Sequence, residues 1–186
     1  MSPNYLLYMS AQGGLPNEMD RAIADGANIN TADLFGIPVL HKACMGGNVR
    51  CIYLSIEAGA DIEAEDSTGL TAVQICMQEN RPASAIVMLD SGADGSGLWN
   101  NGRNLLHWCV IQGFDWLIER SVRQGANING LSRSGHTPIG LAAEQGKVAC
   151  VKTLLDCGAN PLHLKNICLT AEIAQLVSAF RARSLA

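Results

Sequence analysis

The chain has 186 residues, of which 48% are apolar and 16% charged, which excludes both an intrinsically disordered chain and a mini-protein held by disulfides or metal ions. No stretch approaches 18 uninterrupted apolar residues, and residues 1–10 lack the basic start and apolar run of a secretory signal, so we expect neither a membrane span nor export. Residues 1–98 hold 12 acidic and 4 basic side chains, whereas residues 99–186 hold 5 and 9. This gradient either orients a charged partner or is an incidental bias of a solvated surface.

Cysteine and glycine usage narrows the class further. The seven cysteines show no Cys-x-x-Cys spacing, which argues against a disulfide framework or a zinc ribbon and favours a reducing cytosol. Only 5% of residues are aromatic, while 19 are glycine. We therefore expect an interior of small side chains, as in tightly stacked helices.

An internal repeat is the strongest signal in the chain. The tripeptide Gly-Ala-Asn/Asp recurs at a fixed interval of 33 residues. Its five copies begin at Gly26, Gly59, Gly92, Gly125 and Gly158. A constant period of this length predicts that one structural unit is repeated along the chain.

Each interval carries the signals of two short helices. The first helix starts at a capping Pro, Thr or Asn, namely Pro38, Thr71, Asn104 and Thr137. It ends at a residue type that reaches the left-handed conformation, namely Gly47, Asn80, Gly113 and Gly146. The second helix has apolar or small residues at i and i+4, as at Ile52 and Ile56. Such a unit is stable only when stacked on neighbours, so we predict an all-α helical solenoid.

These residues resemble the ankyrin repeat, whose pattern is Asp-x-x-Gly-x-Thr-Pro-Leu-His-x-Ala-Ala, then Gly, then Leu-Leu-x-x-Gly-Ala-Asp. The leading acid is present at Asp33 and Asp66, but the equivalent residues are Trp99, Ser132 and Lys165. The histidine is present at His41 and His107, but becomes Gln74 and Gly140. The resemblance implies a single ankyrin domain over residues 1–186. Its expected parts are an N-terminal cap at 1–32, full repeats at 33–65, 66–98, 99–131 and 132–164, and a C-terminal cap at 165–186.

Residues that could carry chemistry are assigned structural roles. His41 and His107 occupy the histidine position of the repeat, where the ring is expected to bond the backbone of an adjacent turn. Four cysteines share repeat positions with small core residues, namely Cys51, Cys76, Cys109 and Cys150. Cys157 is the thiol that we expect to be most exposed. No acid, base and nucleophile are expected to converge, so we predict no enzyme, cofactor or metal site.

Two further activities receive little support from the sequence. The glycine-rich stretch 92–102 lacks the Gly-Lys-Ser/Thr ending of a phosphate-binding loop, and Gly95 and Ser96 predict only an altered, looser finger there. Nucleic-acid binding would use basic residues near Trp99, Trp108 and Trp116, but these lie on both helices and turns. The basic residues concerned are Arg103, Arg120, Arg123, Arg133, Lys147 and Lys152.

The family resemblance implies a concave partner-binding surface made by the turns, or fingers, and the first helix of each repeat. The predicted contacts are Leu34, Phe35, Met45, Ser67, Thr68, Gln78, Glu79, Trp99, Asn100, Asn101, Arg103, Trp108, Ile111, Gln112, Arg133, His136, Glu144 and Gln145. Exposed Phe35 and Trp99 have the composition of a binding hot spot, with Trp99 as the centre. The alternative is that both rings fold back onto neighbouring fingers. Trp108 can face the groove, whereas Trp116 is expected on the outer side.

The predicted function is recognition of a partner protein without catalysis, in which binding itself inhibits or masks the partner. The resemblance extends to toxin-immunity proteins and to pathogen or viral effectors that block a target. The alternatives are an adaptor or regulatory subunit of a larger complex and, more remotely, a nucleic-acid binder. We expect a monomer with no small-molecule substrate, in the cytoplasm or, for a secreted effector, in the host-cell cytosol.

Overall fold

The computed structural model describes residues 2–99, 101–164 and 167–183. Its contacts divide the chain into two compact units, Met1–Asp94 (the N-terminal unit) and Gly95–Ala186 (the C-terminal unit), which we describe in turn. Regular structure in the described ranges is helical, and the only strand-like pairings there are the isolated bridges Ala32–Pro38 and Glu65–Thr71. The predicted all-α fold class is therefore confirmed. Whether the chain is a single domain with the boundaries given above stays a prediction.

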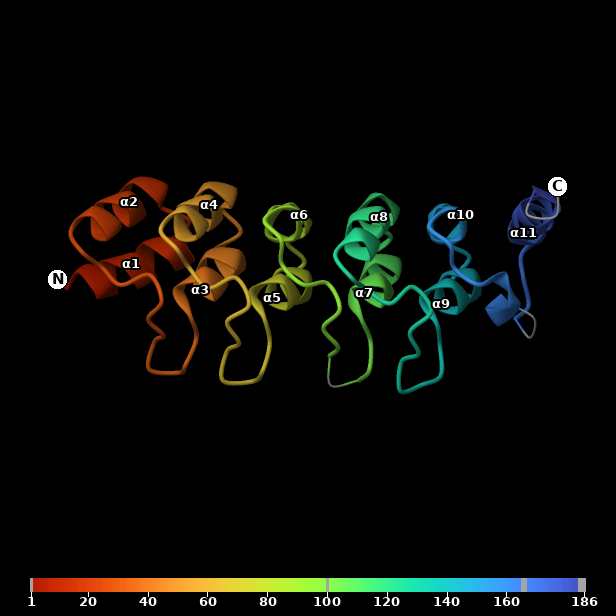
Figure 1. Ribbon diagram of the computed structural model, residues 1–186, viewed down its shortest axis with the longest axis horizontal. Helices are drawn as coiled ribbons and strands as arrows, with labels where there is room; N and C mark the ends of the chain where they lie inside the picture. Colours follow the sequence, from red (N-terminus) through yellow and green to blue (C-terminus); the bar gives the residue numbers. More distant parts are fainter. Residues whose placement is uncertain (1, 100, 165–166, 184–186) are drawn as a thin grey trace. The chain divides into compact units, whose positions relative to one another are not determined.

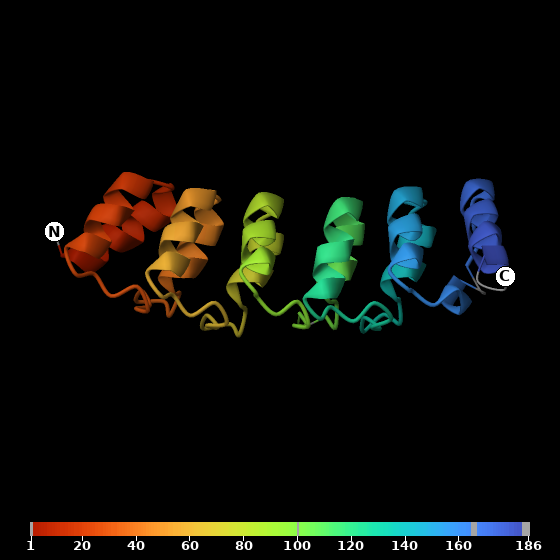
Figure 2. The ribbon, with the colours of Figure 1, turned by 45° about the horizontal axis from the view of Figure 1, so that its top comes forward.

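The N-terminal unit contains three helical hairpins. Their helices are α1 (Pro3–Gly13), α2 (Pro16–Ala24), α3 (Val39–Gly46), α4 (Val49–Glu57), α5 (Ala72–Gln78) and α6 (Pro82–Asp90). The first helices of the hairpins, α1, α3 and α5, pack in an inner row, and α2, α4 and α6 form an outer row (Figure 1). Finger 1 (residues 32–38) and finger 2 (residues 65–71) leave the inner row on the same side (Figures 1 and 2).

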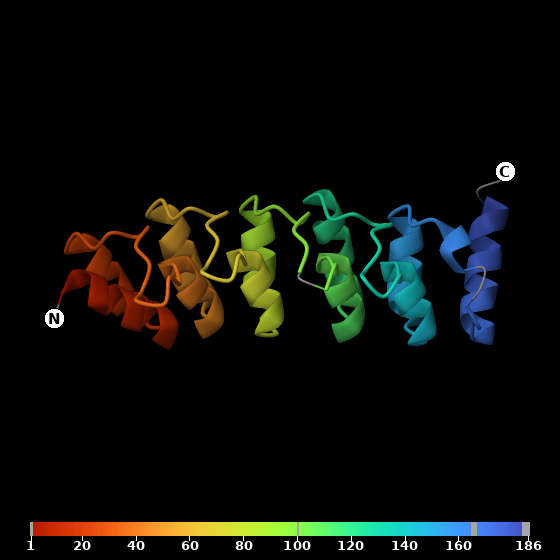
Figure 3. The same cartoon turned by 90° about the horizontal axis from the view of Figure 1, so that it is seen from below.

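The C-terminal unit repeats this arrangement but ends differently. Its elements are α7 (Leu105–Gln112), α8 (Asp115–Arg123), α9 (Pro138–Glu144), α10 (Val148–Asp156), the 3₁₀ helix η1 (Pro161–Leu164) and α11 (Ala171–Arg183). Helix α7 packs on α9 in the inner row, while α8, α10 and α11 follow one another in the outer row. Finger 3 (residues 98–104) and finger 4 (residues 131–137) lie along one edge of these helices (Figure 3). Because α11 packs on α10, the inner row ends with η1 against α9.

The helix ends match the sequence signals. Pro38, Thr71, Asn104 and Thr137 are the N-cap residues of α3, α5, α7 and α9. The four break residues all adopt the left-handed conformation, with φ from 53° at Asn80 to 78° at Gly113. Asn80 is the only such residue in the described ranges that is not glycine. The 33-residue period therefore predicted both where these helices begin and where the chain reverses.

The core of each unit consists of small and branched side chains, as the composition suggested. Gly46 shows how closely the helices approach, because a Cβ atom there would lie 2.7 Å from the carbonyl oxygen of Gln12. The four cysteines predicted at core positions are buried, as is Cys44, and all seven are free thiols. The prediction for Cys157 was wrong: it is half-buried, whereas Cys168, which precedes α11, is exposed. Burial raises the pKa of the Cys157 thiol, and nearby carboxylates add to this rise.

Fingers 2 and 4 are each held by a histidine at the same position of the preceding inner helix. Nε2 of His41 bonds the carbonyl oxygen of Leu70 in finger 2 at 2.8 Å, and Nε2 of His107 bonds that of His136 in finger 4 at 2.9 Å. Both predicted histidine roles are confirmed. Gly140 replaces the histidine in α9, where a Cβ atom would already lie 3.3 Å from the side chain of Ile167. At this position of α9, Ile167 therefore lies in the space that a larger side chain would need.

Candidate partner-binding surface

The predicted contact residues lie at the finger tips and at the ends of the inner helices. None of the 17 that fall within the described residues is buried; Asn100 lies outside those residues. The exposed members are Leu34, Phe35, Ser67, Thr68, Gln78, Glu79, Asn101, Arg133, Glu144 and Gln145. The half-buried members are Met45, Trp99, Arg103, Trp108, Ile111, Gln112 and His136. That these residues contact a partner stays a prediction.

Finger 1 presents two large apolar side chains to solvent. Leu34 is fully exposed and Phe35 is 76% exposed, so this ring does not fold back as the alternative interpretation required. The equivalent residues of finger 2, one period later, are Ser67 and Thr68. The repeat fold therefore does not need apolar residues at this tip, and exposed apolar side chains of this kind are common at protein interfaces.

An ion pair holds the base of finger 1. Nζ of Lys42, from α3, lies 3.0 Å from the carboxylate of Asp33, and both side chains are mostly buried, with 12% and 19% exposed. The same carboxylate accepts hydrogen bonds from the backbone N–H groups of Phe35 and Ile37. Burial alone would raise the pKa of Asp33, but the bonds from Ile37, Lys42 and Phe35 outweigh it and lower the pKa below 3.8. The finger is therefore fixed while its tip stays exposed.

Finger 3 is built differently, because Trp99 stands where finger 1 has Asp33. The Trp99 ring lies 6.5 Å from the Trp108 ring of α7, between centroids, and its Nε1 is buried with no partner among the described residues. Its side chain therefore folds against its own repeat and is not an exposed tip. The lost carboxylate is replaced in part by Asn101, whose Oδ1 accepts the N–H of Arg103 at 3.0 Å.

Finger 4 brings together a group that the sequence did not predict. Nδ1 of His136 lies 2.9 Å from Oγ of Ser134, and Nε2 of His136 lies 3.1 Å from a carboxylate oxygen of Glu144 on α9. The expectation that no acid, base and nucleophile converge was therefore wrong. The His136 and Glu144 side chains are 37% and 41% exposed, so water screens the pair. A cavity of about 300 Å³ lies beside His136, Gly140 and Ile167.

Two buried histidines are held in the neutral form. Burial lowers the pKa of His41 and of His107, and this outweighs the backbone hydrogen bonds from their rings, which act in the opposite direction. Neither ring is available to a ligand, because both are fully buried in the inner helices. No group of three or more metal-binding side chains occurs within residues 2–99, 101–164 and 167–183.

Several basic side chains of the C-terminal unit are already engaged. Nζ of Lys147 donates to the carbonyl oxygens of Val110 and Ile111, both at 2.6 Å, and so caps the end of α7. Arg123 pairs with Glu119 one turn away on α8. These contacts reduce the cationic surface that a phosphate backbone would need. In the part of the chain that the structure describes, no helix is long and apolar enough to cross a membrane.

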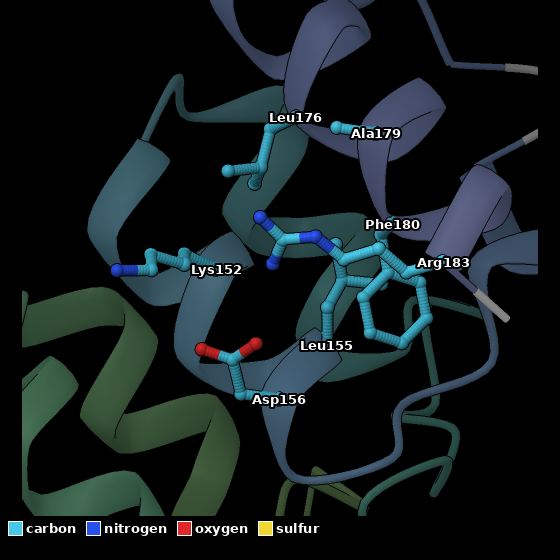
Figure 4. A pocket seen from close by; sticks show the side chains of 7 residues that line it. All are labelled: Lys152, Leu155, Asp156, Leu176, Ala179, Phe180 and Arg183. Carbon is cyan, nitrogen blue, oxygen red and sulfur yellow. The ribbon is translucent and has the colours of Figure 1, made fainter.

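A small cavity between α10 and α11 lies on the outer row. Figure 4 shows Leu155, Leu176 and Phe180 lining this cavity, together with charged side chains from both helices. Those charged residues are Lys152, Asp156 and Arg183. Its volume of about 130 Å³ is too small for a cofactor, and we interpret it as a gap in the packing of the last helix pair.

Stacked helical hairpins with projecting fingers define a repeat protein, and the comparisons with known proteins identify the repeat family. A family model described as ankyrin repeats (3 copies) matches residues 6–96 and 92–164. The chain belongs to the ankyrin-repeat family, whose repeats are protein–protein interaction modules and are generally non-catalytic.

Curated relatives share these repeats over parts of larger proteins. The chain is 32% identical to mouse rabankyrin-5 over 160 residues, and this match covers 82% of the chain and 13% of that protein. It is 25% identical over 165 residues to a mouse B-cell lymphoma 3 protein homolog, covering 86% of this chain and 37% of the relative. It is 32% identical over 103 residues to mouse protein phosphatase 1 regulatory subunit 27, covering 54% of this chain and 66% of the relative. The chain thus spans less than two thirds of the length of these relatives.

Proposed function

We propose that the chain binds a partner protein through its fingers and inner-helix ends, without catalysis, and that this binding masks or inhibits the partner. The carrying observation is the apolar tip of finger 1, which the fold does not require and which finger 2 lacks. Exposed rings and branched side chains are typical of interface hot spots. A relative named as a regulatory subunit supports control of another protein as the output.

The Ser134, His136 and Glu144 group does not change this proposal. Its His136 and Glu144 side chains are 37% and 41% exposed, so water reaches the group and screens the contact between them. We assign the group to shaping finger 4, where Ser132 Oγ also accepts the N–H of His136 at 3.2 Å. A reducing location, the cytosol of the producing cell or of a host, is proposed on the basis of the seven free thiols.

The test is recovery of the native partner. The tagged chain is used to capture proteins from a cell lysate, and the captured protein is identified by mass spectrometry and titrated with the purified chain. Masking predicts that the partner's own activity falls to a minimum at one chain per partner. If that activity persists while a second protein joins the complex, the chain is an adaptor. If no protein is captured and generic DNA or RNA binds instead, the proposal is wrong.

Variants then locate the surface. Arg103→Gln and Gln78→Ala change predicted contacts that are not buried, so weaker capture would place the partner on them. Trp99→Ala tests the predicted centre of the surface and needs a parallel stability measurement, because Trp99 packs on Trp108. Unchanged affinity for Trp99→Ala would show that Trp99 is not the centre.

A further inference from the structure

The N-terminal unit contains an open groove between α1 and finger 1. Tyr5, Tyr8 and Met9 line it from α1, while Leu34 and Phe35 line it from finger 1. Tyr5 and Met9 are each about half exposed, and their spacing of four residues places them on one face of the helix. The groove has a volume of about 380 Å³, which is sufficient for one or two large side chains of a ligand.

The walls of this groove are held in place from behind. The hydroxyl of Tyr8 is 2.8 Å from Oγ1 of Thr31, and Oδ1 of Asn4 accepts the N–H of Asn28 at 2.9 Å, which ties α1 to the chain leading into finger 1. The Asp33–Lys42 pair lies within the groove and neutralises both of its charged side chains. A preformed, largely apolar groove suits an apolar side chain better than an isolated charge.

The N-terminal unit, which contains the groove, is strongly acidic. All 12 acidic and 4 basic residues counted above for residues 1–98 lie in the N-terminal unit. Three of its four basic residues, Arg21, Lys42 and Arg50, already lie within ion-pair distance of carboxylates of the same unit. Positive charge from a partner therefore has little competition at this surface.

Finger 2 places part of this negative charge next to the groove. A Cβ atom on Gly36, in finger 1, would lie 3.2 Å from the Cβ atom of Ser67, so the two fingers touch. The segment of finger 2 that precedes Ser67 contains Glu65 and Asp66. Glu65 is exposed, as is Glu79 just after α5, and neither has an ion pair among the described residues.

We propose that this groove binds a segment of a protein partner that carries an apolar or aromatic side chain next to lysines or arginines. The apolar side chain inserts between α1 and finger 1, and the basic side chains face the carboxylates of finger 2 and the end of α5. This inference rests on the proposed function and adds to it the chemistry of the partner.

The experiment selects random 12-residue peptides displayed on phage with the full chain as the target. The selected peptides are synthesised, and their affinities are measured by fluorescence anisotropy. The decisive variant is Leu34→Ser with Phe35→Thr, which installs the residues of the finger 2 tip and keeps the repeat fold. A second variant, Glu65→Gln with Glu79→Gln, removes two exposed charges. Matched controls are Leu131→Ser on finger 4 and Glu172→Gln on α11.

The selected peptides are expected to share an apolar residue beside at least two basic residues. The finger 1 variant should weaken binding about tenfold or more, the charge variant should weaken it several-fold and reduce its salt dependence, and the controls should bind normally. Peptides without basic residues, peptides indifferent to the finger 1 variant, or no selected peptides would each overturn the inference. If the native partner is captured equally by the finger 1 variant, only this inference fails and the proposed function stands.

Discussion

The bases of finger 1 and finger 3 are held by side chains at the same two repeat positions, but by different kinds of contact. In the N-terminal unit, Asp33 and Lys42 form a mostly buried ion pair at 3.0 Å. In the C-terminal unit, the residues 66 positions later, Trp99 and Trp108, form a ring pair with centroids 6.5 Å apart. In each of these two repeats the residues at the two positions contact each other, so we expect that changing one of them alone leaves either an unpaired carboxylate or a gap.

The two bases also determine what each finger can offer a partner. Because an ion pair holds finger 1, its aromatic residue, Phe35, is free at the tip. In finger 3 the aromatic residue itself forms the base, so Trp99 supports the finger, and Leu98 and Asn101 are exposed. Phe35 is therefore exposed at a finger tip, whereas Trp99 is half-buried in a finger base.

The largest effect is expected at the histidine position. The His107 ring makes two hydrogen bonds. Its Nε2 bonds the carbonyl oxygen of His136, and its Nδ1 accepts the N–H of Asn104 at 3.2 Å. Nδ1 of His41 is buried with no partner among the described residues. His107→Ala should therefore lower the free energy of unfolding by about 3 kcal/mol, and His41→Ala by about 2 kcal/mol. Urea denaturation measures both, and equal losses would contradict the distinction.

Exchanging the finger bases should show that the two positions act as a pair. Trp99→Asp alone places a carboxylate against Trp108, and we expect a loss of about 2 kcal/mol. Adding Trp108→Lys should recover about 1 kcal/mol relative to the sum of the two single changes. The near-ultraviolet circular dichroism of the paired rings should disappear in every variant. Additive losses in the double-mutant cycle would show that the positions are independent.

The pH dependence of stability should separate the contribution of the buried histidines from that of the Asp33 carboxylate. Because burial lowers the pKa of His41 and His107, folding favours the neutral rings, and their contribution is lost as the pH falls below the ordinary value of 6.5. Because the pKa of Asp33 is lowered below 3.8, its carboxylate stabilises the folded state above pH 3.8. This stability is lost as the pH falls from 3.8 through the lowered pKa. His41→Gln, which copies Gln74, should reduce the first loss to the part that His107 contributes, and Lys42→Met should reduce the second. Urea midpoints between pH 3 and 8 test both, and an unchanged profile would contradict the assignment.

Periodicity predicted backbone features well and side-chain directions poorly. The caps and left-handed breaks follow from single residues such as Thr137 and Gly47, whose local preferences act within a few positions. The direction of Trp99 depends on Trp108, nine residues later, and the exposure of Cys168 depends on a segment that departs from the repeat. The sequence-based expectation therefore named positions that are not buried but left open which aromatic residue is exposed.

The contact between Ser134, His136 and Glu144 illustrates the same limit. Two of these residues share one turn, while Glu144 comes from the end of the following helix. Only the path of finger 4 over α9 brings them within hydrogen-bonding distance. A period indicates which residues are equivalent between repeats, but it does not indicate which residues within a repeat are neighbours.

The smallest expected effect is a gain, and it tests why the two histidines differ. Nδ1 of His41 has no donor because Pro38, the N-cap of α3, has no N–H, whereas Asn104 supplies one to His107. Pro38→Thr would add both this N–H and a capping hydroxyl, as Thr137 provides for Gly140 at 3.2 Å. A gain of about 1 kcal/mol from these bonds is partly offset by the greater freedom of the unfolded chain, so we expect a net gain of about 0.5 kcal/mol. Pro38→Ala, which adds only the N–H, separates the two contributions, and a loss of stability in both variants would show that the missing donor is not what limits His41.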